Sequence, residues 1–137
     1  MKKFTLFLLL LSFWCSINGQ QKPMKIVFDV TSSDAKVHES ALRHVKAMSK
    51  NYPDSEFEVV IYSGALNMVL KDKSTIGDEI EMFADNDKVN FIVCQGTMRR
   101  FKADKNDIVK GVNFVPDGIL EIVDKQSKGW GYIKEAN

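Results

Sequence analysis

The sequence contains little cysteine and little histidine, with two residues of each among 137. Two cysteines, Cys15 and Cys94, provide no disulfide framework, so a hydrophobic core must hold the fold together. The two histidines, His38 and His44, are six residues apart, and a helix would place them on different faces. Because no carboxylate or thiol ligand set accompanies them, the sequence predicts no metal site.

Several catalytic and cofactor-binding motifs are also missing. The chain has no Walker loop, no GxGxxG fingerprint, no HExxH motif, no CxxC pair and no GxSxG turn. These absences weigh against a nucleotide-binding enzyme, and we expect no cofactor. The formal net charge is only +1, whereas a nucleic-acid partner would favour a concentrated basic face. We therefore expect no nucleic-acid partner.

An apolar run over residues 4–14 follows a basic start. The run is too short to span a bilayer, which requires about 20 apolar residues. A basic start, an apolar run and a small polar exit together predict a signal peptide at residues 1–19. We therefore expect an exported, periplasmic protein of the Gram-negative type, with no membrane span in the mature chain. A lipoprotein anchored at Cys15 is the alternative, although bulky aromatic residues precede that cysteine.

Cleavage of this segment would leave 118 residues, which is enough to bury a hydrophobic core. Loss of Lys2 and Lys3 would lower the formal net charge from +1 to −1. Cys94 would then be the one remaining cysteine. In an oxidising compartment such a thiol is buried and inert, paired between chains, or reactive.

Short apolar runs alternate with segments of helical periodicity. The runs predict buried strands at residues 25–30, 57–62, 89–93, 112–115 and 130–133. Helices are predicted from Asp34 to near Asn51, from near Ser74, and from Pro116 to Gly129. This alternation predicts a three-layer α/β sandwich with a mostly parallel five-stranded sheet. We expect one such domain over residues 24–134.

Two details of these elements bear on packing and on chemistry. In the last helix, spacing puts three apolar residues on one side: Ile119, Ile122 and Val123. Asp29 interrupts the first apolar strand, where it is either a functional acid near a strand end or a hydrogen-bonded structural one. For Trp130 and Tyr132, on the last strand, we expect core or subunit packing.

Ligands of parallel sheets bind beyond the carboxyl ends of the strands, where three predicted loops meet. These loops comprise residues 31–34, 63–65 and 94–97. The third loop begins with Cys94, at the junction of a strand and a helix. Backbone N–H groups and the positive end of a helix dipole favour the thiolate at such a position. A buried, unreactive cysteine is the alternative, because cysteine is among the most often buried residue types.

The neighbours of Cys94 suit a thiolate or a persulfide. Gly96 permits a close turn of the backbone, Thr97 can cap the helix or donate to an anion, and Arg99 adds positive charge. Gln95 supplies a further backbone amide. The other two loops contribute three candidate cleft-lining residues: Ser33, Ser63 and Gly64.

Three segments carry a resemblance to a known family: residues 91–98, 111–122 and 129–134. With the strand and turn at residues 59–64, this ordered set resembles DsrE/DsrF-like proteins. The resemblance implies an α/β sandwich related to the Rossmann and flavodoxin folds, assembled as homotrimers or hexamers. It also implies a cysteine that, in the best understood members, carries sulfur as a persulfide between donor and acceptor proteins.

Cys94 matches the family's cysteine after the third main strand. Relatives often read Cys-Gly-Asn-Thr there, and this chain has Gln95 and Gly96 in place of Gly-Asn. Many relatives also have His-Gly after the second strand, where this chain has Ser63 and Gly64.

Two functions of different classes follow. The first is a sulfur carrier or thiol-reactive protein with Cys94 as the nucleophile or persulfide site; its reaction would be sulfur transfer rather than conventional enzymatic turnover. The second is a non-catalytic module that keeps the fold and binds a small ligand or a partner protein.

Overall fold

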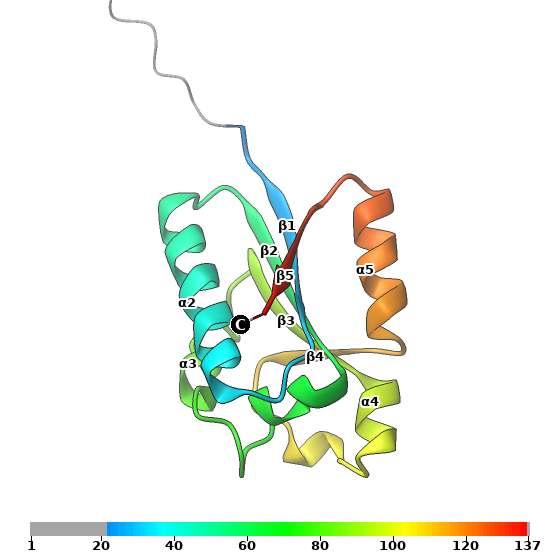
Figure 1. The fold of residues 1–137 in the computed structure, drawn as a ribbon. Coiled ribbons are helices and arrows are strands. Elements are labelled where there is room, and N and C mark those ends of the chain that lie inside the picture. The colour runs from blue at the N-terminus through cyan, green and yellow to red at the C-terminus, as the bar shows by residue number, and fades with distance from the viewer. Residues whose placement is uncertain (1–21, 137) are drawn as a thin grey trace, which may run out of the picture.

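Five parallel strands form the centre of the structure, a computed structural model that describes residues 22–136 (Figure 1). The order across the sheet is β4-β3-β2-β1-β5. The strands are β1 (Lys25–Val30), β2 (Glu56–Ile61), β3 (Val89–Cys94), β4 (Val112–Val115) and β5 (Gly131–Glu135). This sheet confirms the predicted α/β fold, and it is parallel throughout. The predicted signal peptide and Cys15 lie outside the described residues.

Helices on both faces of the sheet complete three layers. The α-helices are α2 (Ala35–Asn51), α3 (Gly77–Glu81), α4 (Gln95–Arg100) and α5 (Gly118–Ser127), and the 3-10 helices are η2 (Ser63–Met68) and η3 (Lys105–Asp107). Figure 1 shows α2 and α3 on one face, α5 on the other, and α4 near the edge where the strands end. Within residues 22–136, no helix is long and apolar enough to cross a membrane.

The longest helix, α2, begins and ends where the sequence predicts. The Asp34 carboxylate accepts a hydrogen bond from the backbone N–H of Lys36 at 2.9 Å, which caps the first turn. The helix ends at Asn51, two residues before Pro53, because proline disfavours helical geometry in the residue that precedes it. The loop from β1 to α2 is thereby fixed beside the ends of the strands.

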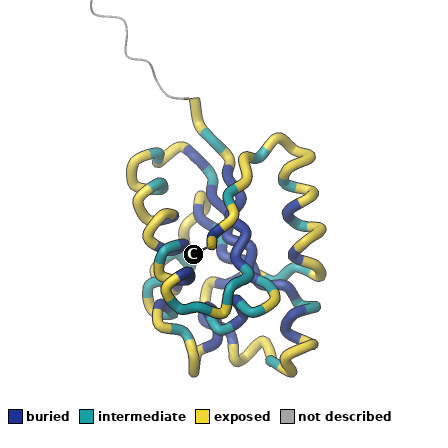
Figure 2. Tube along the Cα trace, in the orientation of Figure 1, coloured by how far each residue is buried: buried dark blue, intermediate teal, exposed yellow. Residues whose placement is uncertain are grey.

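Most of the apolar core lies between the sheet and α2 (Figure 2). The parallel register places Phe28, Val59 and Phe91 side by side on this face. All three side chains are buried, and each such burial stabilises the fold by about 2–3 kcal/mol. This layer therefore makes the larger apolar contribution to stability.

The opposite face is more polar, and α5 packs on it through a small apolar cluster of Val27, Val60 and Ile122. The predicted apolar side of this helix is only partly buried. Ile122 faces the sheet, whereas Ile119 and Val123 are 58% and 55% exposed. Successive helix positions are about 100° apart, so a helix over so narrow a cluster buries only the residue that points straight at it.

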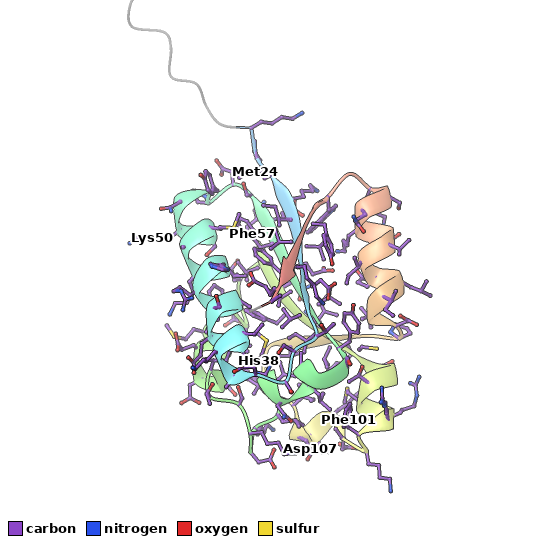
Figure 3. The ribbon with its side chains drawn as sticks, in the orientation of Figure 1. Met24, His38, Lys50, Phe57, Phe101 and Asp107 are labelled. Atoms are coloured by element: carbon purple, nitrogen blue, oxygen red, sulfur yellow. The ribbon has the colours of Figure 1, made fainter. Side chains whose placement is uncertain are left out.

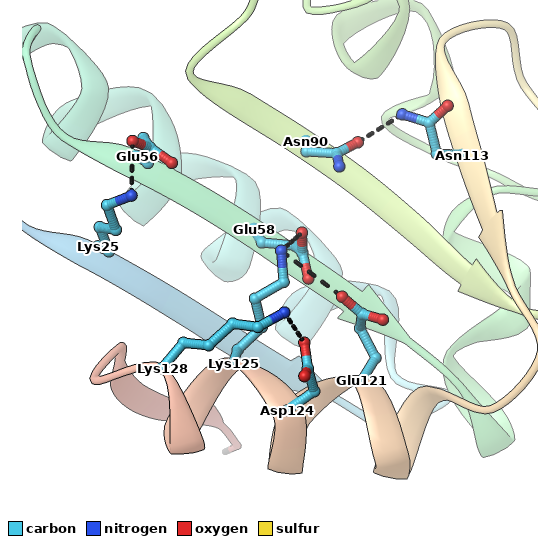
Figure 4. Close-up of polar contacts among 9 residues, drawn as sticks. All are labelled: Lys25, Glu56, Glu58, Asn90, Asn113, Glu121, Asp124, Lys125 and Lys128. Carbon is cyan, nitrogen blue, oxygen red and sulfur yellow. Dashed lines mark hydrogen bonds and ion pairs between the residues drawn. The ribbon is translucent and has the colours of Figure 1, made fainter.

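An ion pair between Glu58 of β2 and Lys125 holds the carboxyl-terminal half of α5 on the sheet (Figure 4). Their charged groups are 2.6 Å apart, and Glu121 lies 3.5 Å from the same Lys125 nitrogen. Burial raises the pKa of Glu58, and the positive charge of Lys125 opposes that rise. The Lys125 ammonium also lies 4.4 Å from the centre of the Trp130 ring. A buried acid thus depends on one lysine from α5.

Two glycines with left-handed backbone provide a matched test of packing around β4. Gly111 has φ +84°, and an added Cβ would lie 2.6 Å from the Ala84 Cβ; Gly129 has φ +83°, with nothing within 4 Å. We expect Gly129→Ala to cost about 1–2 kcal/mol, the strain of the backbone alone. Gly111→Ala should cost at least about 1 kcal/mol more, because the added methyl overlaps the chain at Ala84. Urea denaturation measures both, and equal losses of stability would contradict the close approach.

Candidate functional site

Cys94 is the last residue of β3 and the residue immediately before α4. Its extended backbone, φ −73° and ψ 118°, lets the strand pass directly into the helix. The residue is 7% exposed, and it is the free cysteine of residues 22–136. The predicted strand-to-helix junction is therefore present, with the thiol at the carboxyl edge of the sheet.

The turn between β4 and α5 covers the thiol. The Cys94 Sγ lies 4.0 Å from the carbonyl oxygen of Pro116, at the limit of a weak S–H···O hydrogen bond. Gly118, the first residue of α5, lies so close that an added Cβ would be 3.3 Å from the Cys94 Cβ and 3.4 Å from the Tyr62 Cβ. The absence of a side chain at Gly118 is what allows the helix to begin directly over Cys94.

Gly96 and Arg99 approach the thiol from the other side. A Cβ added at Gly96 would lie 3.4 Å from the Cys94 Sγ, 3.7 Å from the Pro116 carbonyl oxygen and 3.8 Å from the Arg99 Nη2 atom. The volume that a side chain would occupy at Gly96 therefore lies between the sulfur and a guanidinium. Gln95 is half-buried beside it. The structure thus places Cys94, Gly96 and Arg99 close together.

A cavity of about 230 Å³ adjoins this side of the site. Its lining residues come from α4 and the segment that follows it: Gln95, Met98, Arg99, Ala103, Asp104 and Lys105. Two cations and one acid line it, so the cavity favours a polar group of net negative charge.

Thr97 connects α4 to the turn after β2. Its side chain is buried, and its hydroxyl oxygen accepts a hydrogen bond from the backbone N–H of Ser63 at 3.0 Å. Ser63 has φ +55°, a left-handed conformation that is uncommon for a residue with a side chain. The Thr97 hydroxyl therefore helps to hold this turn beside the site.

The predicted cleft-lining residues of the other two loops meet at the same edge. An added Cβ at Gly64 would lie 3.1 Å from the carbonyl oxygen of Thr31 and 3.2 Å from the backbone nitrogen of Ser33. Gly64 therefore permits this contact between loops, while Ser33 and Ser63 remain exposed. In Figure 3 the labelled His38 lies near the start of α2, and its Nε2 is 2.7 Å from the Ser32 carbonyl oxygen.

No metal-binding group of three or more histidine, cysteine, aspartate or glutamate side chains occurs within the described part of the chain. His38 is engaged by the loop carbonyl, and the Nδ1 atom of His44 lies 2.8 Å from a Glu135 carboxylate oxygen. Each histidine is thus satisfied separately, at a different place in the fold.

A polar cluster on β1 and β5, which the sequence alone does not reveal, lies on the same face of the sheet as Cys94. Asp29 is 5% exposed and accepts hydrogen bonds from the Tyr132 hydroxyl at 2.6 Å and the Lys134 ammonium at 3.0 Å. The same ammonium donates to the Thr31 hydroxyl at 2.6 Å. Asp29 is therefore a hydrogen-bonded acid near the strand ends. The alternation of residues along each strand could have indicated which side chains share a face of the sheet. The hydrogen-bond partners of Asp29, however, depend on β1 lying next to β5.

Tyr62 lies between this cluster and Cys94. Its backbone is extended, with φ −152° and ψ 177°, so it continues β2 by one residue. Burial first, and then the charge and hydrogen bonding of Asp29, raise the pKa of Tyr62 to about 12. A hydrogen bond to Asp29 is the main cause that raises the pKa of Tyr132 to about 12. Both phenols therefore stay protonated at neutral pH.

Comparison with known proteins agrees with this architecture. Residues 24–134 match the model of the DsrE/DsrF-like family. The structure is similar to that of the protein of unknown function MTH1491 from Methanobacterium thermoautotrophicum, at 27% identity and TM-score 0.75 over 81% of this chain and 98% of that one. It shares a fold with the conserved protein of unknown function BT1422 from Bacteroides thetaiotaomicron, at 14% identity and TM-score 0.62 over 80% and 93%. No curated protein matches the sequence.

The two raised tyrosine pKa values predict a loss of stability in alkali. Below pH 10 both phenols are protonated in the folded and the unfolded chain, so their contribution is fully present. Between about pH 10 and 12 the unfolded chain loses protons that folded Tyr62 and Tyr132 keep, so the free energy of unfolding falls. Urea denaturation across this range measures the slope, which the double change Tyr62→Phe, Tyr132→Phe should reduce. An unchanged slope would show that these phenols are not the cause.

Gly118→Ala tests the cover over Cys94. The added methyl would press on Cys94, Tyr62 and Val60, so we expect the first turn of α5 to move away from the sheet. Alkylation of Cys94 in the folded protein, read by peptide mass spectrometry, should then be several-fold faster. Gly131→Ala is the matched control, because its nearest contact would be 3.7 Å and its alkylation rate should match that of the wild type. If both variants label at the wild-type rate, α5 does not restrict access.

Proposed function

Because the chain belongs to the DsrE/DsrF-like family, we propose that it is an exported sulfur carrier that holds sulfur on Cys94 as a persulfide. The observation that carries this proposal is the position of the thiol. Cys94 ends a buried parallel strand at the carboxyl edge of the sheet, where α/β folds bind their ligands. It also lies in the part of the chain that matches the family.

Space and charge beside the thiol support an added sulfur. The position that a Cβ would take at Gly96 is in van der Waals contact with Sγ at 3.4 Å, the Pro116 carbonyl oxygen at 3.7 Å and the Arg99 guanidinium at 3.8 Å. An outer sulfur placed there would carry its negative charge toward a cation. The Gly96 backbone also permits this approach, because a side chain at that position would fill the space.

The proposed transfer step balances without an oxidant or a reductant. A thiolate of an acceptor attacks the outer sulfur of the Cys94 persulfide and forms a new S–S bond. The bond between the outer sulfur and Sγ breaks, and its electron pair remains on Sγ as a thiolate. The ionised outer sulfur takes up a proton from solvent before the attack and leaves as the acceptor's persulfide.

Access is the main requirement of this mechanism, because Cys94 is 7% exposed and lies under the Pro116 carbonyl. An acceptor thiol must reach the sulfur either over Gly96 or after the turn before α5 moves. The cavity lined by Arg99 and Lys105 would receive part of the acceptor's surface, although neither Cys94 nor Gly96 lines it. A donor or acceptor protein with an acidic surface near its reactive thiol would suit these cations.

The proposal includes export and self-assembly. The basic start and apolar run of residues 1–19 support a signal peptide and a periplasmic location, with lipidation of Cys15 as the alternative. Exposed apolar side chains on α5 support a homotrimer or hexamer: Ile119, Leu120 and Val123 are each more than half exposed.

A second function, a non-catalytic binding module, is favoured by one specific observation. The Pro116 carbonyl oxygen lies 4.0 Å from Sγ, where it accepts a hydrogen bond from a thiol and repels a thiolate. In such a module Cys94 would be a buried structural residue, and Cys94→Ser would leave cellular function intact.

Intact mass spectrometry of the exported protein tests the sulfur-carrier proposal. Wild-type protein loaded with a persulfide donor should gain the mass of one sulfur atom, and a reducing agent should remove it. Cys94→Ser should gain none, while remaining folded by circular dichroism. The same spectra report cleavage of residues 1–19 and any lipid, and native conditions report the number of subunits. Equal sulfur loading of wild type and Cys94→Ser, or no loading of either, would contradict the proposal.

A further inference from the structure

Polar side chains from three neighbouring strands lead across the sheet to Cys94. Lys134 of β5 pairs in register with Asp29 of β1. One step beyond the paired residues Ile61 and Val93, the extended chain places Tyr62 of β2 beside Cys94 of β3. Since alternate strand residues share a face, all four side chains lie on the face that α5 covers.

The row contains one buried negative charge, which is closely paired with one exposed positive charge. Asp29 is 5% exposed, and both of its carboxylate oxygens have partners. Lys134 supplies the positive charge, and its ammonium also lies 6.0 Å from the centre of the Tyr62 ring. Asp29 is level with Val60 and Ile92, so Cys94 lies two strand spacings across the sheet and two residues further along it. The two backbones are therefore about 12 Å apart, which is close enough for a charge at Asp29 to act on the sulfur.

Tyr62 lies close enough to both groups for each to affect its pKa. Both Asp29 and Cys94 contribute to the raised pKa of this one phenol, after the larger effect of burial. Because the phenol keeps its proton, it adds no charge between them at neutral pH. The charge balance at this position is therefore set by Asp29 and Lys134.

We propose that the Asp29–Lys134 ion pair tunes the reactivity of the Cys94 thiol. Lys134 neutralises the carboxylate of Asp29, so that a buried negative charge does not oppose the thiolate needed for sulfur transfer. Asp29 in turn holds Lys134 in place on the exposed edge strand. This inference rests on the proposed function, in which Cys94 is the reactive group.

Other titratable and charged groups face the same site, and the variants proposed below leave these groups unchanged. Arg99 of α4 approaches from the Gly96 side, and Asp117 caps α5 by accepting from the backbone N–H groups of Ile119 and Leu120. Tyr132 donates to Asp29 and is itself protonated below about pH 12. On the inner side of α5, Glu121 is engaged with Lys125.

The test compares two variants that should change Cys94 in opposite directions. The alkylation rate of Cys94 is measured against pH in the folded, full-length protein by peptide mass spectrometry. Asp29→Asn leaves Lys134 unopposed, so the midpoint of the rate profile should move to lower pH by about half a unit. Lys134→Met leaves the carboxylate unopposed, so the midpoint should move to higher pH by a similar amount. A merely structural role would not move the profiles in opposite directions.

The ion pair between Lys25 and Glu56 is the matched control. It joins a lysine and an acid 3.1 Å apart. Both residues begin their strands, β1 and β2, so the pair lies at the other end of the sheet from Cys94. Lys25→Met and Glu56→Gln change the net charge by the same amounts as the test variants, and their midpoints should equal that of the wild type.

Opposite shifts in the test pair, with none in the controls, support the inference. Unchanged or same-direction midpoints overturn it while the proposed function stands. If Asp29→Asn does not fold, Lys134→Met decides the question, because Lys134 is 40% exposed and its loss removes little packing. A folded wild-type protein whose Cys94 does not label at any pH overturns both the inference and the sulfur-carrier function.

Discussion

Parallel strand register is the constraint on which the site depends. Because side chains alternate between faces, one register decides that Tyr62 and Cys94 lie side by side and that Asp29 meets Lys134. A shift of one residue in the register of any strand would move that strand's polar side chain to the opposite, apolar face of the sheet. The apolar core under α2 fixes that register, since Phe28, Val59 and Phe91 must all be buried there.

The two faces of the sheet differ in composition. The face under α2 is apolar and supplies most of the buried hydrophobic contact, whereas the face under α5 carries charged and titratable groups. On that second face, α5 is held by Ile122 and by the ion pair of Lys125 with Glu58. Its first turn meets the sheet at Gly118, directly over the thiol, whereas Ile119 and Leu120 are exposed. The cover of the candidate site is thus in close contact with the sheet at Gly118.

Much of the fold could be predicted from the sequence, because its signals are local. Continuous apolar runs located the strands, and Asp34 and Pro53 located the limits of α2. The side of α5 that faces the sheet was harder to assign, because Ile119, Ile122 and Val123 are equally apolar and only packing distinguishes them.

The position of Cys94 at the carboxyl edge was also predictable, since it follows a buried strand directly. Its contacts were not, because they come from distant parts of the chain: Pro116 and Gly118 from the turn before α5, and Tyr62 from β2. The partners of Asp29 depend in the same way on β5 returning to lie beside β1. Sequence spacing carries no information on such contacts until the order of the strands is known.

Cyanolysis of the persulfide-loaded protein tests the proposal that Cys94 carries transferable sulfur. Cyanide releases sulfane sulfur as thiocyanate, so the loaded protein can be assayed without knowing its natural donor or acceptor. We expect loaded wild-type protein to release a stoichiometric amount of thiocyanate, and Cys94→Ser treated in the same way to release none. Loaded wild-type protein that releases no thiocyanate, or a Cys94→Ser protein that releases as much, would contradict it.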